Sequence, residues 1–162
     1  MASPALSPGF SRDISHPTRL RLPDLLHATD SYAEAVLDGR FDHLLPPGGL
    51  PRDQRWFRRL HADDELDVWL ISWVAGHNTE LHDHAGSLGA LTVLSGSLNE
   101  YRWAGDHLRL RRLDAGDQAA FPLGRVHDVG YADSGDGAPA LSVHAYSPPL
   151  TAISYVIARN PG

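Results

Sequence analysis

The segment GHNTELHDHAGSLGALTVLSG, residues 76–96, decides the fold, because it sets two histidines between glycines as Gly-x5-His-x-His-x4-Gly-x6-Gly. A second segment, residues 116–127, reads Gly-x5-Pro-x-Gly-x2-His. His82 and His84 are two residues apart, so on a strand their side chains point to the same face. His127 must come from another strand, because three ligands of one ion cannot all lie on one strand. Together the two spacings predict a mononuclear metal site of three histidines on a small β-barrel.

The predicted site has no carboxylate ligand. In sites of this kind a carboxylate often follows the His-x-His pair by a few residues, and here the position is Gly89. The ligand set is therefore three neutral imidazoles, which suit zinc, copper, iron or nickel and do not by themselves name the metal. The alternative interpretation is three unrelated structural or exposed histidines, but two matched spacings in separate segments argue against it.

The rest of the chain predicts an all-β domain with a short N-terminal helix. Residues 23–38 read as the helix, with Pro23 in its first turn and Gly39 at its end. Strands are expected at 67–74, 90–94, 97–103, 108–113, 118–121, 126–129, 140–146 and 153–158. Many short strands at even spacing are typical of a closed or sandwiched β fold. Residues 1–20, rich in Pro and Ser, predict a flexible arm before a single domain of residues 21–162.

Composition limits the partners. The chain has 162 residues, a formal net charge of -6 and a pI near 5.9, which argue against nucleic acid as the main partner. No apolar run is long enough for a signal peptide or a membrane span. The chain has no cysteine, so disulfides are excluded and a reducing cytoplasm is the expected location. The sequence leaves the oligomeric state open.

The two histidine segments resemble the paired motifs of the cupin superfamily, although Tyr131 occupies the place of the asparagine that usually ends the second motif. Within that superfamily the chain resembles the cysteine dioxygenase family of thiol dioxygenases, through residues 73–84 and the later run 141–149. The resemblance implies a single cupin-type β-barrel, also called a double-stranded β-helix. It also implies that His82, His84 and His127 hold Fe(2+), and that the enzyme adds both atoms of O2 to a small thiol to give a sulfinate.

Three neutral ligands suit that chemistry, since they leave the iron with its full +2 charge for a substrate thiolate. The resemblance further implies that Ser142, His144 and Tyr146 form a hydrogen-bonded relay whose tyrosine hydroxyl acts on oxygen. These three alternate along one predicted strand and share a face. The alternative is that they are buried packing residues with satisfied hydrogen bonds. Some relatives crosslink this tyrosine to a cysteine, and because that position is Gly89 here, Tyr146 is expected to act without a crosslink.

The resemblance also points to the substrate-binding residues. Family members place an arginine on the strand before the metal strand, and Arg58 aligns there, where its planar guanidinium could hold a carboxylate with two hydrogen bonds. Arg59 is interpreted as a solvated neighbour. Trp56 stands where the family often has tyrosine, and its indole could line a pocket for a larger or cationic thiol.

The predicted reaction is therefore oxidation of a small thiol, with L-cysteine as the first candidate substrate. Ergothioneine and 3-mercaptopropionate remain alternatives for the same reaction. A hypothesis of another class is a cupin that binds a metal or ligand without turnover, as a sensor or storage module, although such a protein has no need of the relay. An isomerase or a carbon-cleaving dioxygenase is a third, disfavoured by Gly89 and by the run around Tyr146.

Overall fold

The computed structural model describes residues 18–76 and 86–150. The first helix of the described residues is α2 (Leu22–Leu37), followed by a short 3-10 helix, η1 (Asp42–Leu44). The strands are β1 (Trp56–Ala62), β2 (Asp67–Trp73), β3 (Leu88–Ser95), β4 (Ser97–Trp103), β5 (Leu108–Asp114), β6 (Gln118–Phe121), β7 (His127–Ala132) and β8 (Ala140–Ser147).

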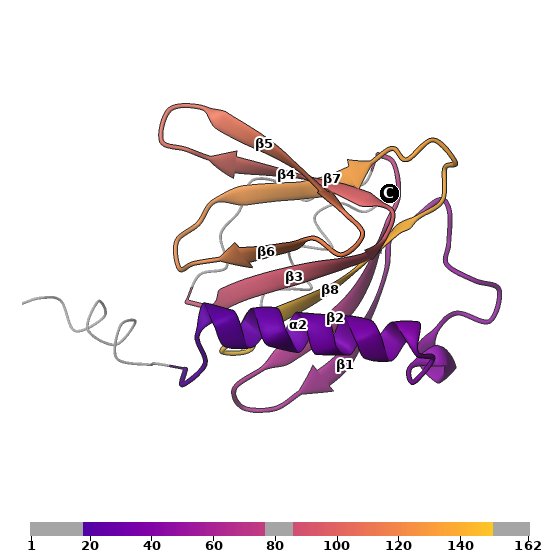
Figure 1. Ribbon diagram of the computed structural model, residues 1–162, viewed down its shortest axis with the longest axis horizontal. Helices are drawn as coiled ribbons and strands as arrows, with labels where there is room; N and C mark the ends of the chain where they lie inside the picture. Colours follow the sequence, from indigo (N-terminus) through magenta and orange to yellow (C-terminus); the bar gives the residue numbers. More distant parts are fainter. Residues whose placement is uncertain (1–17, 77–85, 151–162) are drawn as a thin grey trace, which may run out of the picture.

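These strands form two antiparallel sheets that face each other. One has the order β1-β2-β8-β3-β6 and the other the order β5-β4-β7. Helix α2 crosses the outer face of the five-stranded sheet, and the three-stranded sheet lies on the opposite side (Figure 1). Within the described residues, the sheets are not hydrogen-bonded into a closed ring. The described part of the chain is a two-sheet β architecture with one α-helix, as the sequence predicts.

Strand β2 explains how the layers are held together. All seven of its residues are buried, because both of its faces are covered. Trp69, Ile71 and Trp73 point between the two sheets and belong to the inner core, whereas Val68 and Leu70 pack under α2. This alternation follows from the two-residue period of a strand. The face of β2 that carries its tryptophans is therefore the face on which a site enclosed by the sheets must lie.

Helix α2 forms where the sequence predicts it. Pro23 lies in the first turn, and the Arg21 backbone N–H donates to Asp24 Oδ2 at 2.8 Å, which satisfies a donor at the helix start. Leu25, Ala33 and Val36 face the sheet. The helix packs along β3 and β8, so it supports from behind the strand that carries the candidate relay.

Several sequence expectations are confirmed by these bounds. The expected and observed strands agree closely from β2 to β8, and Gly76, Gly96, Gly116 and Gly124 all have positive φ at the ends of segments. At Gly96, between β3 and β4, an added Cβ would lie 2.9 Å from the Ala140 Cα, so this turn requires glycine. The expected strand at 153–158 and residues 1–17 of the expected arm lie outside the described residues.

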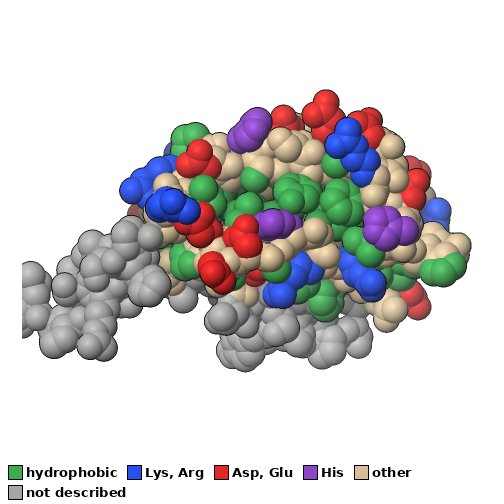
Figure 2. All heavy atoms as spheres, turned by 90° about the horizontal axis from the view of Figure 1, so that it is seen from below, with side chains coloured by type: hydrophobic (Ala, Val, Ile, Leu, Met, Phe, Trp, Pro, Cys, Tyr) green, Lys and Arg blue, Asp and Glu red, His purple; other side chains and the backbone are tan. Residues whose placement is uncertain are grey.

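The described surface carries charges of both signs. On the face in Figure 2, basic and acidic side chains are intermingled around a centre of hydrophobic side chains. No helix among the described residues is long and apolar enough to cross a membrane.

Candidate active site

Strand β8 brings Ser142, His144 and Tyr146 onto the inner face of the five-stranded sheet. Ser142 is fully buried, and the other two side chains are at most 5% exposed. Ser142 Oγ lies 2.8 Å from His144 Nε2, and His144 Nδ1 lies 3.3 Å from the Tyr146 hydroxyl. The three residues therefore form a continuous hydrogen-bonded chain, which we call the relay.

A fourth residue, Trp73, contacts the start of the relay. Its indole Nε1–H donates to Ser142 Oγ at 2.9 Å, and an indole nitrogen can only donate. When Ser142 donates its own hydroxyl proton to His144 Nε2, a neutral His144 carries its proton on Nδ1 and donates to the Tyr146 oxygen. The hydroxyl hydrogen of Tyr146 is thereby left to point away from His144, toward a further acceptor.

The hydroxyl of Tyr146 holds its proton firmly. Burial raises the pKa of this phenol far above its ordinary value, and the nearby carboxylate of Asp67 raises it further. At neutral pH Tyr146 is therefore a hydrogen-bond donor rather than a phenolate. A donor at the end of a buried relay is suited to contacting an oxygen that gains negative charge during a reaction.

Gly89 lies directly beside this hydroxyl-bearing ring. It pairs with Tyr146 across β3 and β8, and a Cβ built on it would lie 2.9 Å from Phe121 Cδ2 and 3.2 Å from Tyr146 Cε1. The space that a carboxylate at position 89 would need is filled by these two rings. The structure thus gives a packing reason for the glycine, in addition to the ligand-set reason that the sequence suggested.

His127 is the one predicted metal ligand that the structure describes. It begins β7, is 1% exposed and packs against Phe121 with ring centroids 4.2 Å apart. His127 Nδ1 lies 3.2 Å from Oε2 of the buried Glu100 on β4. Because a carboxylate accepts hydrogen bonds, His127 donates from Nδ1, and its lone pair is on Nε2, the arrangement usual for a metal-bound imidazole. His127 therefore fits the role of a metal ligand.

The other two predicted ligands, His82 and His84, fall in residues 77–85 and so lie outside the described residues. Among the described residues, no group of three or more His, Asp or Glu side chains could hold a metal ion. The three-histidine site accordingly remains a prediction. Of its three ligands, the structure describes His127.

Glu100 is a candidate functional residue that the sequence alone does not indicate. Burial by itself raises the pKa of this carboxyl, but hydrogen bonding and charge from His127 and Arg111 outweigh that effect and lower it. Arg111, on the neighbouring strand β5, donates from its terminal NH2 to Glu100 Oε1 at 3.1 Å. The only sequence signal was a lone acidic residue at an inward position of a predicted strand.

The two predicted substrate-binding residues, Arg58 and Trp56, are not brought to this site. On β1, Arg58 pairs with Leu70 and is exposed, and Trp56 pairs with Ser72 and packs against the core under α2. Both therefore lie on the helix side of the sheet, away from Tyr146. Their role in substrate binding stays a prediction, and in this register they lie on the face of the strand opposite to that of Arg59.

The inner face of β1 carries the neighbouring arginine instead. Arg59 pairs with Trp69, and its guanidinium carbon lies 4.6 Å from the centre of the Trp69 ring. Trp69 in turn pairs with His144 of the relay. Within the described part of the chain, Trp69 Nε1 is a buried donor that has no hydrogen-bond partner. A buried N–H donor beside a cation is suited to receiving an anionic group.

Arg55, just before β1, lies at the far end of the relay. Its guanidinium carbon is 5.3 Å from the centre of the Trp73 ring, and burial lowers the pKa of this arginine, with the charge of Asp128 acting in the opposite direction. This stacking holds the indole that directs the relay.

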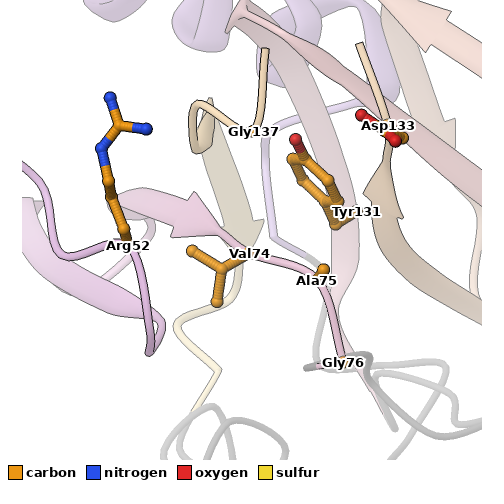
Figure 3. A pocket seen from close by; sticks show the side chains of 7 residues that line it. All are labelled: Arg52, Val74, Ala75, Gly76, Tyr131, Asp133 and Gly137. Atoms are coloured by element: carbon orange, nitrogen blue, oxygen red, sulfur yellow. The ribbon is translucent and has the colours of Figure 1, made fainter. Parts of the chain in front are cut away.

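A separate hollow of about 430 Å³ opens where β2 and β7 end. In Figure 3, Arg52 stands on one side of it, and Tyr131 and Asp133 stand on the other. The hollow adjoins the end of β8 that begins at Ala140, because Val74 follows Trp73 and Trp73 pairs with Ala140. Tyr146 is six residues further along β8, about 20 Å away on an extended strand. This hollow is therefore distinct from the end of the relay.

Comparisons with known proteins agree with this geometry. The family model described as cysteine dioxygenase type I matches residues 51–156. Cysteine dioxygenase type 1 of Danio rerio is 29% identical over 114 residues, covering 60% of this chain and 54% of that protein. The Homo sapiens protein of the same name is 28% identical over 110 residues, covering 59% and 52%. The chain thus spans about half the length of the curated relatives it matches.

The fold is also found among solved structures. A protein of Klebsiella pneumoniae with a double-stranded β-helix domain superposes with a TM-score of 0.52 and 20% identity, covering 66% of this chain and 85% of that one. The likeness confirms the predicted cupin-type double-stranded β-helix.

Proposed function

Because the chain belongs to the cysteine dioxygenase type I family, we propose that it is an iron-dependent thiol dioxygenase whose first candidate substrate is L-cysteine. The reaction is RSH + O2 → RSO2H, in which the S–H proton is retained on the product and both oxygen atoms join the sulfur. The observation that supports this proposal best is the buried relay. It begins at the indole N–H of Trp73 and ends in a protonated Tyr146.

We assign the iron to His82, His84 and His127. Ferrous iron bound there would supply the open coordination positions at which a thiolate and dioxygen meet. The residues of the chain supply the rest. Gly89, packed against Phe121 and Tyr146, keeps a fourth protein ligand out of the site. His127 is oriented through Nδ1 by Glu100.

The relay has the task of holding a proton at the Tyr146 oxygen. With Ser142 donating to His144 Nε2 and His144 donating from Nδ1, the phenol cannot give its proton back to His144 Nδ1, because that nitrogen is itself protonated. The phenol proton is therefore directed to the reacting oxygen, where a hydrogen bond or proton transfer lowers the barrier. This arrangement gives the relay a purpose that a module which only binds a metal lacks.

For the substrate carboxylate we propose Arg59 and Trp69 rather than Arg58. Arg59 and Trp69 are on the inner face at the level of His144, and Trp69 Nε1 is a buried donor with no partner within the described ranges. An anionic carboxylate would satisfy that donor and also contact the guanidinium, whose Nε lies 3.8 Å from Asp67 Oδ1. This choice favours a thiol that carries a carboxylate, such as L-cysteine or 3-mercaptopropionate, over cysteamine.

Oxygen uptake by the iron-loaded protein against a panel of thiols tests the proposal. We expect consumption of one O2 per thiol, fastest with a carboxylate-bearing thiol. Cysteine, 3-mercaptopropionate, cysteamine and ergothioneine would separate the substrate alternatives. If cysteamine is consumed as fast as cysteine, the reaction stands and the carboxylate assignment fails. If no thiol is consumed by protein that holds iron, the chain is a binding module and the proposed activity is wrong.

A further inference from the structure

Glu100 and His127 are neighbours on the inner face of the three-stranded sheet. Glu100 pairs with Val129 and Arg102 pairs with His127, so the two side chains are diagonal neighbours across β4 and β7. Both are almost completely buried, at 2% and 1% exposure. Glu100 Oε2 is 3.2 Å from His127 Nδ1, and Phe121 packs against the imidazole ring from another side. The ring is therefore restrained both by a hydrogen bond and by packing.

We propose that Glu100 is a positioning residue for the metal centre. It fixes the tautomer and the ring orientation of His127, so that Nε2 is presented to the ion. The inference rests on the proposed three-histidine iron site and adds to it a residue that does not touch the ion. A carboxylate behind a ligating imidazole increases the basicity of the imidazole and holds it in place.

Arg111 explains how this carboxylate is compatible with a site of three neutral ligands. Its guanidinium pairs directly with Glu100 across β4 and β5 and donates to Oε1, while Oε2 faces His127. The positive charge of Arg111 balances the negative charge of Glu100. The chain thus orients a ligand with a carboxylate while adding no net negative charge beside the ion. A carboxylate at position 89 would instead bind the ion directly and lower its charge.

The neighbouring acidic residue Asp114 offers a matched control. It lies on the same β4–β5 hairpin and accepts from Arg112 Nε at 2.9 Å, but it is exposed and pairs with Ser97 rather than with an inward-facing residue. Glu100→Gln keeps the side-chain size and removes the charge behind His127. Asp114→Asn makes the same chemical change on a carboxylate that also pairs with an arginine but does not touch His127.

The test is the affinity of the metal-free full chain for Co(II), measured by competition with a chelator. We expect Glu100→Gln to bind Co(II) about 10- to 100-fold more weakly than wild type. Asp114→Asn should be unchanged, and His127→Ala should lose tight binding. If Glu100→Gln binds as wild type while His127→Ala does not, the positioning role is overturned and the metal site stands. If His127→Ala binds as wild type, the proposed metal site is wrong and the role of Glu100 falls with it.

A measurement on the wild-type chain tests the same role of Glu100 and does not depend on whether a Glu100 variant folds. Long-range ¹H–¹⁵N spectra of histidine-labelled, metal-free protein report which ring nitrogen carries the proton, and the His127 signals are those missing from His127→Ala. We expect a proton on Nδ1. A ring protonated on Nε2 alone would overturn the assignment, because Glu100 could not then accept from Nδ1.

Discussion

At the scale of single residues, the site depends on where one hydroxyl hydrogen points. Trp73 donates to Ser142, and when Ser142 donates to His144, Tyr146 is left with its own proton directed outward. Burial keeps the phenol protonated.

Replacing Tyr146 by Phe removes only the hydroxyl. We expect turnover to fall by roughly 10²–10⁴-fold, because the hydroxyl is the last donor of the relay. Iron content and the Michaelis constant for the thiol should stay close to wild type, since the ring still packs beside Gly89. Steady-state oxygen uptake measures turnover and the Michaelis constant, and metal analysis measures the iron content. Unchanged turnover would reduce Tyr146 to a packing residue.

Gly89→Ala tests the packing around that ring. The new Cβ would lie 2.9 Å from Phe121 Cδ2, so a ring must move, at a cost of about 1–3 kcal/mol in the free energy of unfolding. We expect turnover to fall as well, because Tyr146 is the other neighbour. Gly86→Ala is the control, since a Cβ there meets nothing within 4 Å. Equal stability of the two variants in denaturant titrations would contradict the crowding argument.

Some contacts of the site can be predicted from the sequence and others cannot. The i, i+2 spacing of Ser142, His144 and Tyr146 puts them on one face of any strand, so their alignment was predictable. The partnership of Glu100 with His127 was not, because it depends on β4 lying beside β7. Trp73 was missed for the same reason, since its contact with Ser142 needs β2 to pair with β8.

At the scale of elements, the register of β1 decides which arginine can reach a substrate. The β1 pairing places Arg58 opposite Leu70 on the helix side and Arg59 opposite Trp69 on the inner side. The sequence could not distinguish the two, because adjacent residues of a strand differ only in face. A register error of one residue reverses the assignment.

The adjacent arginines form a matched pair of variants. We expect Arg59→Ala to lower kcat/KM for cysteine about ten- to a hundredfold, the equivalent of about 1.5–3 kcal/mol for a charge-assisted contact. Cysteamine, which lacks the carboxylate, should be little affected, and Arg58→Ala should alter neither substrate. If Arg58→Ala lowers kcat/KM for cysteine and Arg59→Ala does not, the substrate binds on the helix side of β1 and the proposed binding face is wrong.

The β2–β8 pairing brings Trp73 to Ser142, and the variant Trp73→Phe tests this contact. Loss of the indole N–H frees Ser142 to rotate and releases the direction of the relay, so turnover should fall about tenfold. The double variant with Ser142→Ala should be no slower than Ser142→Ala alone, because Trp73 acts through Ser142. Independent, additive losses would show that the indole has another role.

At the scale of the whole molecule, two facing sheets gather residues from distant parts of the chain. The inner face of one sheet supplies the relay on β8, while β7 of the other supplies His127. Most of this architecture was predictable, because glycines with positive φ and alternating strands are local properties. The order of strands in each sheet is not local, and it produces the contacts that the sequence did not reveal.

We propose that this molecule adds both atoms of O2 to the sulfur of a small thiol. Mass spectrometry of the product formed by iron-loaded wild-type protein under ¹⁸O2 tests that reaction, with Tyr146→Phe as the slow control. We expect a sulfinate in which both new oxygen atoms carry the label. A disulfide as the product, or a sulfinate with oxygen from water, would contradict it.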